Sequence, residues 1–248
     1  MALYSDEGLV LRTVKLGEAD RIITILTRDH GKIRAVAKGV RRLKSRFGAR
    51  LEPFMRADLL IATGRSLDVV SQASAKGMYG DRIIGDYDSY VNASVVAETA
   101  DRLFAALDEP SPSQYMLAVG AVSALARRLH APTDIGDSYV LRALSIAGWT
   151  PRLDSCVVCG GGDDLAAFSI PGGGVMCARG RTPEAIRVTR DDVMRLKALL
   201  AGDWGTLDVR PAGGADGGDS VSRVHDIVEH WAEYYLERPI RSAHLLDS

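Results

Sequence analysis

The opening third of the chain consists of short segments that favour β-strands, and this pattern constrains the fold more than any other feature. Each segment is rich in β-branched residues or alternates loosely between polar and apolar positions, and turn residues separate the segments. Five such strands with no long helix among them predict a small barrel, either the five-stranded oligonucleotide-binding (OB) fold or an SH3-like barrel. The predicted strands cover residues 7–14, 20–27, 32–38, 54–62 and 67–75.

The rest of the chain is predicted to be mainly helical, which makes the whole an α+β protein. Thr189 can cap the helix that follows it, and Pro239 forces an end on the last helix. The Gly- and Asp-rich segment 211–220 predicts a surface loop. Apolar residues recur at helical spacing over residues 89–106, 114–129, 136–147, 190–201 and 222–237.

These patterns divide the chain into four segments, two of which form one domain. An OB-fold nucleic-acid-binding domain covers residues 1–80, and an all-α domain is formed by residues 81–150 and 184–248. A zinc-finger-like insertion, residues 151–183, interrupts the helical domain.

Charge is distributed unevenly between these parts. The chain has a net charge of −1, with 31 Lys and Arg against 32 Asp and Glu. Residues 1–80 contain 15 basic and 8 acidic residues, so the remainder holds 16 and 24. This asymmetry predicts that the first part contacts a polyanion and that the remainder serves other partners.

Most of the excess positive charge lies between residues 32 and 50, a stretch without a single acidic residue. Such a stretch is typical of a surface that neutralises phosphates and releases their counterions. The aromatic ring within it can stack on an unpaired base, which favours single strands. The alternative is a solvated basic loop without a ligand. The candidate DNA-binding residues are Lys32, Arg34, Lys38, Arg41, Arg42, Lys44, Arg46, Phe47 and Arg50.

The start of this stretch alternates between polar and apolar residues. The alternation predicts that Lys32, Arg34 and Lys38 share one face of a strand, with Ile33 and Val36 off that face. The sheet itself is then expected to present a basic surface.

Three cysteines form a candidate metal site. Cys156 and Cys159 make a C-x-x-C pair, and Cys177 follows after 17 intervening residues, a spacing typical of a zinc ribbon. The fourth thiolate is expected at position 180, which is Gly180. Either zinc binds with a carboxylate, a distant histidine or water as its fourth ligand, or the finger has lost its metal. The local carboxylates are Asp154, Asp163 and Asp164.

Several function classes are disfavoured by what the chain does not contain. We find no P-loop, no G-x-S-x-G motif and no convincing pair of catalytic carboxylates, so we expect no enzymatic activity. The N-terminal segment lacks the architecture of a signal peptide, and no window approaches the roughly 18 apolar residues that a membrane span needs. We therefore expect a cytoplasmic protein.

With these features, the chain resembles the bacterial RecO family of recombination mediators. The specific part of the resemblance is EGLVLRTVKLGEADRIITILTRDHGKIRAVAKGVRRLKSRFGARLEPF, residues 7–54, and the order of helices and cysteines extends it over nearly the whole chain. The resemblance implies an OB fold, a helical domain, a zinc-binding insertion and no catalysis. It also implies binding to single- and double-stranded DNA, annealing of complementary strands, and cooperation with RecR to load RecA onto DNA coated by single-strand-binding protein.

The resemblance also suggests a surface for the acidic, hydrophobic tail of single-strand-binding protein, which we place at Arg127, Arg128 and Arg142. Two rival functions stay open. One is an RNA-binding OB-fold module, which would bind RNA at least as tightly as DNA. The other is a metal-dependent nucleic-acid enzyme that uses the cysteine site, although that site lacks a general base.

Overall fold

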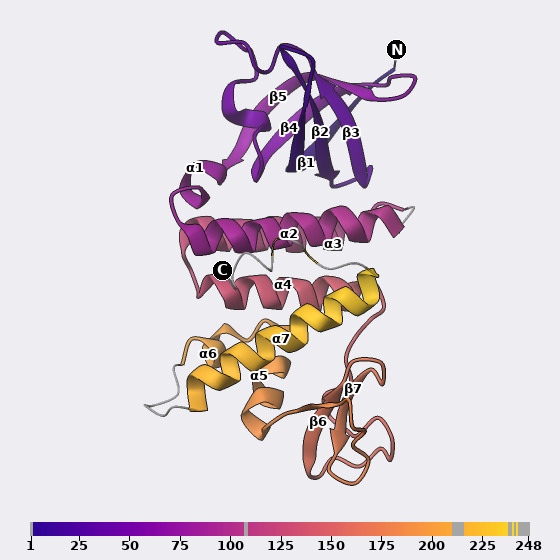
Figure 1. The fold of residues 1–248 in the computed structure, drawn as a ribbon. Coiled ribbons are helices and arrows are strands. Elements are labelled where there is room, and N and C mark those ends of the chain that lie inside the picture. The colour runs from indigo at the N-terminus through magenta and orange to yellow at the C-terminus, as the bar shows by residue number, and fades with distance from the viewer. Residues whose placement is uncertain (1, 107–108, 210–215, 238–239, 241, 243–248) are drawn as a thin grey trace. The chain divides into compact units, whose positions relative to one another are not determined.

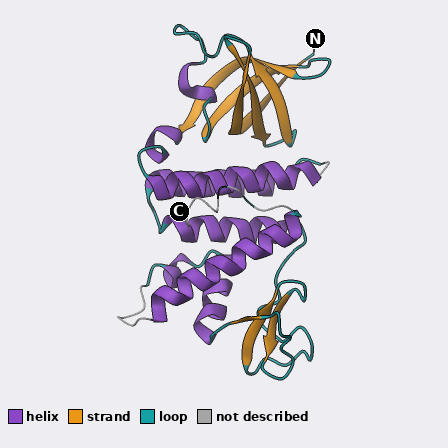
Figure 2. Ribbon diagram, in the orientation of Figure 1, coloured by secondary structure: helices purple, strands orange, loops and turns teal. Residues whose placement is uncertain are grey.

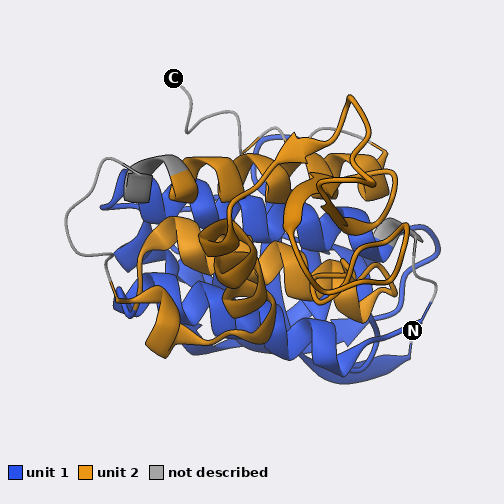
Figure 3. Cartoon of the chain, turned by 90° about the horizontal axis from the view of Figure 1, so that it is seen from below, with its two compact units in different colours: residues 1–129, 245–248 blue, residues 130–244 orange. Residues whose placement is uncertain are grey.

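A computed structural model describes residues 2–106, 109–209, 216–237, 240 and 242. Its contacts divide the chain between residues 129 and 130 into two compact units, blue and orange in Figure 3. This division does not test the predicted domain boundaries, which stay predictions. No helix in the described ranges has the length and apolar character needed to cross a membrane.

The first unit begins with a closed barrel of five strands (Figures 1 and 2). The strand order is β1-β2-β3-β5-β4, with β4 pairing back onto β1 and a short parallel contact between β3 and β5. This order is that of the OB fold, so the predicted fold class is confirmed and the SH3-like alternative is not. The strands are β1 Leu3–Leu16, β2 Asp20–Thr27, β3 Lys32–Ala37, β4 Met55–Ala62 and β5 Asp68–Met78.

The barrel closes on a core of aliphatic side chains that alternate along each strand. Ile23 and Ile25 of β2 and Ala35 and Ala37 of β3 are fully buried. Since alternate residues of a strand face opposite sides, Val36 lies on the outer side with Arg34. This corrects the predicted alternation, which placed Val36 away from the basic face.

Three helices complete the described part of the first unit, with a short 3-10 helix, η1 Gly48–Leu51, between β3 and β4. Ser111 caps α3 by accepting a hydrogen bond from the amide of Gln114, and Arg128 ends that helix in the left-handed conformation. Helices α2 and α3 pack on one another, as amphipathic helices do to bury their apolar faces. The helices are α1 Gly80–Ile83, α2 Tyr87–Ala106 and α3 Pro112–Arg127.

The second unit combines helices with a small three-stranded sheet of order β7-β6-β8. The predicted cap at Thr189 is confirmed, because its hydroxyl accepts from the Asp192 amide while the Asp192 carboxylate accepts from the Thr189 amide. Helix α4 packs against α5 and α7. The elements are α4 Pro132–Ile146, β6 Leu165–Ser169, β7 Gly174–Cys177, β8 Ile186–Arg187, α5 Arg190–Ala201, α6 Trp204–Leu207 and α7 Asp216–Leu236.

The loop predicted over residues 211–220 is partly wrong. Helix α7 begins at Asp216, so residues 216–220 are helical, while 211–215 lie outside the described residues, as does Pro239. The Ser220 hydroxyl donates to Asp192 of α5, and Val224, Ile227 and Val228 are buried. Tertiary packing of this apolar face outweighs the poor helix propensity of the glycines at its start.

Candidate nucleic-acid interface and metal centre

The basic stretch continues from β3 into the connection that leads to β4, and this connection is anchored to the barrel at several points. The Gly39 amide donates to the Asp20 carboxylate over 2.7 Å, and the Arg41 amide donates to the Ala19 carbonyl over 3.0 Å. The Arg41 guanidinium donates to the Glu18 carbonyl over 2.9 Å and also to that of Gly17. The connection therefore lies against the β1–β2 turn, one of the loops through which OB folds bind oligonucleotides.

Not all predicted cations are available to a ligand. Lys32 forms an ion pair with Asp101 of α2, with 2.9 Å between Nζ and Oδ1, and only 17% of the Lys32 side chain is exposed. Arg41 holds the β1–β2 turn, and Arg50 donates to the carbonyls of Arg46 and Phe47. Lys32 thus joins β3 to α2, while Arg41 and Arg50 stabilise the fold of the connection.

The other five predicted cations are exposed and form no ion pair with any residue that the structure describes. The guanidinium of Arg46 lies 4.8 Å from the centre of the Phe47 ring, a cation–π contact that leaves its donors free. Their charge is unbalanced by nearby acids, so it is available to phosphates. This free set is Arg34, Lys38, Arg42, Lys44 and Arg46.

Phe47 does not lie where the sequence analysis placed it. Its side chain is 1% exposed and belongs to the barrel core, together with Val40 and Leu51. The prediction that its ring stacks on a base is therefore wrong. The connection packs on the barrel core, and burying a phenylalanine there is more favourable than exposing it to water.

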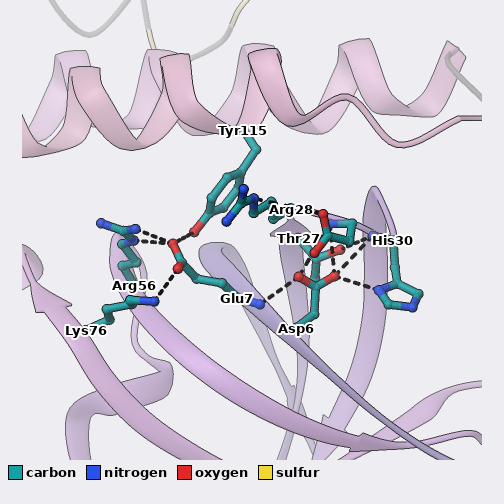
Figure 4. A network of polar contacts seen from close by, with 9 residues as sticks. Asp6, Glu7, Thr27, Arg28, His30, Arg56, Lys76 and Tyr115 are labelled. Carbon is teal, nitrogen blue, oxygen red and sulfur yellow. Dashed lines mark hydrogen bonds and ion pairs between the residues drawn. The ribbon is translucent and has the colours of Figure 1, made fainter.

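Near the β2–β3 turn, a polar network joins the barrel to helix α3 of the same unit (Figure 4). Glu7 of β1 accepts hydrogen bonds from Arg56, from Lys76 over 2.5 Å and from the Tyr115 hydroxyl of α3 over 2.6 Å. Burial alone would raise the pKa of Glu7, but the bonds from Lys76, Tyr115 and Arg56 lower it to about 2. Glu7 is thus charged at neutral pH and fixes α3 to the sheet.

The adjacent residue, Asp6, organises the β2–β3 turn (Figure 4). Its buried carboxylate accepts from the amides of Asp29 and His30, each over 3.1 Å, and contacts His30 Nδ1 at 2.7 Å. The sequence analysis missed both carboxylates. The only available signal was a pair of acids within a segment otherwise suited to a strand.

The three cysteines come together, as their spacing predicts. Their sulfur atoms all lie within 4.8 Å of one another, and Cys159 Sγ is 3.8 Å from Cys177 Sγ. Hydrogen bonds from the backbone amides of Cys159, Cys177 and Val158 lower the pKa of the Cys156 thiol to about 6. Donors of this kind stabilise a thiolate, the form that binds metal.

Position 180 lies where a fourth ligand would be expected, but Gly180 has no side chain to bind a metal. A Cβ atom built on Gly180 would lie 3.5 Å from Cys156 Sγ and 3.6 Å from Cys177 Sγ. A side chain at 180 would therefore contact the thiols, as the fourth ligand of a zinc ribbon does.

Three thiols suit zinc, but a closed structural site needs a fourth ligand. The metal-binding group among the described residues consists of the cysteines alone, so none of the three predicted carboxylates joins it. Asp154 instead pairs with Lys197 of α5 at 2.6 Å. The cluster fits a zinc ion held by three thiolates, with one position open.

Comparison with known proteins identifies the family. A family model described as recombination protein O N terminal matches residues 1–79, and one described as recombination protein O C terminal matches residues 84–244. The chain belongs to the RecO family. The family model boundaries lie on either side of α1, close to the end of β5.

Relatives in the RecO family match the chain over nearly its full length. DNA repair protein RecO of Bifidobacterium adolescentis is 62% identical over 100% of both chains. The RecO proteins of a Nocardioides species and of Streptomyces coelicolor are 44% and 43% identical, over 97% and 98% of both chains. The predicted family, one of DNA repair proteins, is confirmed.

Proposed function

We propose that this RecO-family chain binds single- and double-stranded DNA through its barrel and anneals complementary strands. With RecR, it then helps to load RecA onto DNA coated by single-strand-binding protein. It acts in the cytoplasm, at the nucleoid, and catalyses no covalent step. The observation that carries the DNA-binding part is the free set of five exposed cations, which lie on β3 of an OB fold and on the connection that contacts its β1–β2 turn.

The proposed mechanism of annealing is electrostatic. Two single strands repel each other through their phosphates, and this repulsion slows their pairing. Cations of the free set hold the backbones of both strands close together and release the counterions of each. Binding is then steeply salt-dependent and nearly indifferent to sequence.

The test removes charge from the free set without disturbing the anchors. In a triple variant, Arg42, Lys44 and Arg46 are each changed to Ala, while Arg41 is kept because it holds the β1–β2 turn. We expect weaker binding to single strands, and a salt dependence of log K flatter by up to about three units, since each lost phosphate contact removes about one unit.

A control variant loses the same charge elsewhere, through Arg82→Ala, Arg152→Ala and Arg187→Ala. All three side chains are exposed and lie outside the basic stretch. We expect this variant to keep the wild-type slope. If the loop variant also keeps it, or if both variants lose it equally, the connection is not the interface.

The cysteine cluster has a separate role in this proposal. When bound, zinc would be held by Cys156, Cys159 and Cys177 and would cross-link the loop of the C-x-x-C pair to β7. The finger would then be a structural element, while the helical part of the chain, with its acidic balance, would serve protein partners.

A further inference from the structure

Leu43 differs from the other apolar residues of the basic connection. Val40, Phe47 and Leu51 are folded into the barrel core, whereas the Leu43 side chain is fully exposed. The amide of Ser45 donates to the Arg42 carbonyl over 2.9 Å, which closes a turn with Leu43 and Lys44 at its centre. Leu43 is thus at the apex of the connection.

The apex is held in place by the rest of the connection. The Arg42 amide donates to the Gly39 carbonyl over 3.1 Å, and Gly39 and Arg41 are bonded to the β1–β2 turn. Leu43 therefore projects from an anchored turn.

Exposure of one apolar residue is common on protein surfaces and by itself indicates nothing. The surroundings of Leu43 are what point to a ligand. Arg42 and Lys44 flank it directly, Arg46 lies three residues after it, and all three belong to the free set. A ligand that satisfies this apex must offer anionic groups around an apolar face, and a nucleotide does so with its phosphate and its base.

We propose that Leu43 packs on the face of an unpaired nucleobase while Arg42, Lys44 and Arg46 hold the neighbouring phosphates. This inference rests on the proposed function and adds the residue that contacts bases, the role predicted for Phe47. Apolar side chains do pack on base faces, as in proteins that insert a wedge between the base steps of a duplex, and an unpaired base offers its face without that unstacking. Base faces are hidden by stacking in a duplex, so the contact favours single strands and tolerates any sequence.

The test compares Leu43→Ala with Leu3→Ala, a matched control. Leu3 is an exposed leucine at the opposite end of β1 from the β1–β2 turn. Affinities for a single strand and for a duplex of the same length are measured across a salt series. The single strand carries 2-aminopurine, whose fluorescence reports a change in base stacking. Thermal unfolding checks that both variants fold, which the exposure of both side chains predicts.

We expect Leu43→Ala to lower the single-strand affinity about fivefold, the effect of losing one partly buried aliphatic contact. The 2-aminopurine response should shrink, while the duplex affinity and the salt slope stay at wild-type values because no charge is lost. Leu43→Phe should restore single-strand binding, since an aromatic ring packs on a base at least as well. Leu3→Ala should behave as wild type.

The inference is overturned if Leu43→Ala keeps the wild-type affinity and fluorescence response while the triple charge variant flattens the salt slope. In that case the proposed function stands and the bases are contacted elsewhere. If the wild-type protein shows no salt-dependent binding to either DNA, the proposed function fails, and this inference fails with it.

Discussion

Two apolar residues of the basic connection differ in burial, and we assign them different roles for that reason. Phe47 and Leu43 are both large apolar residues among cations, and only four positions separate them. Phe47 is buried and Leu43 is exposed, so the first contributes to stability and the second is free to contribute to binding.

We predict that Phe47→Ala lowers the free energy of unfolding by about 3 to 5 kcal/mol, because it leaves a cavity in the barrel core. Urea unfolding measures this loss, and Phe47→Leu should recover most of it. Leu43→Ala is the matched control, for which no loss is expected. A stable Phe47→Ala protein with weak single-strand binding would instead return the ring to the DNA interface.

His225 is a second residue whose role only its contacts show. Its Nδ1 lies 2.9 Å from Asp137 of α4, and the side chain is 17% exposed. The hydrogen bond that His225 donates to the Asp137 carboxylate raises the pKa of His225 to about 9, against the opposing effect of burial and with help from the charges of Glu229 and Asp226.

This pair predicts a pH dependence of stability. The folded pKa of about 9 lies above the ordinary value of 6.5, so the charged pair stabilises the fold fully below pH 6.5 and less as the pH rises through 9. We expect His225→Gln to lower the free energy of unfolding by about 2 kcal/mol at pH 6. In urea unfolding this difference should decline at alkaline pH.

His230→Gln is the control for this prediction, since His230 is exposed on the same helix. Its effect on stability should be small at every pH. A His225→Gln effect that is constant from pH 6 to pH 10 would show that the imidazole contributes packing rather than charge.

At the scale of elements, the finger has the fold of a four-ligand metal site but supplies only three thiols. Its two loops bring three thiols together and point position 180 at them, yet glycine occupies that position. The backbone of Gly180 does not require glycine, because its φ is not in the left-handed region and the nearest contact of an added Cβ, with Val158, is 3.4 Å.

We predict that Gly180→Cys raises the affinity for zinc on the order of a hundredfold, because a fourth thiolate closes the tetrahedral site. Competition with a chromogenic chelator under reducing conditions measures the change. Gly180→Ser adds a side chain of similar size without a thiolate and should leave the affinity near the wild-type value. Equal affinities for the Cys and Ser variants would mean that position 180 does not reach the metal.

At the scale of the whole molecule, charge separates the barrel, which we propose binds DNA, from the rest of the chain. The excess of basic residues lies in the barrel, and the acidic excess lies in the remainder of the chain. Arg127 and Arg128 are exposed at the end of α3, whereas Arg142 belongs to the other compact unit. The three arginines predicted to receive the tail of single-strand-binding protein are therefore divided between two units.

We predict that Arg127→Ala with Arg128→Ala weakens binding of a fluorescent peptide with the acidic, hydrophobic sequence of that tail by severalfold, since charge pairs at a rim contribute modestly. Polarisation of the peptide measures this at low and moderate salt. Arg82→Ala with Arg187→Ala removes equal charge and is the control. Unchanged affinity in the first variant would place the tail elsewhere.

The sequence alone predicted much of this structure, and its errors share a cause. The five strands, the OB fold, the Thr189 cap and the meeting of the cysteines follow from patterns within short or neighbouring segments of the chain. The start of α7 was missed because its glycines favour a loop, whereas the helix is stabilised by the buried apolar face further along it and by the bond from Ser220 to Asp192.

What the sequence by itself determined was the family, the order of the elements and the concentration of cations in one segment, because each is recorded in neighbouring residues. Only the tertiary structure decided which of those residues are free. Lys32 is directed to Asp101, 69 residues further along the chain, Arg41 holds the β1–β2 turn, and Phe47 fills the core. Such assignments depend on partners that barrel closure brings together from distant positions, and no local pattern contains them.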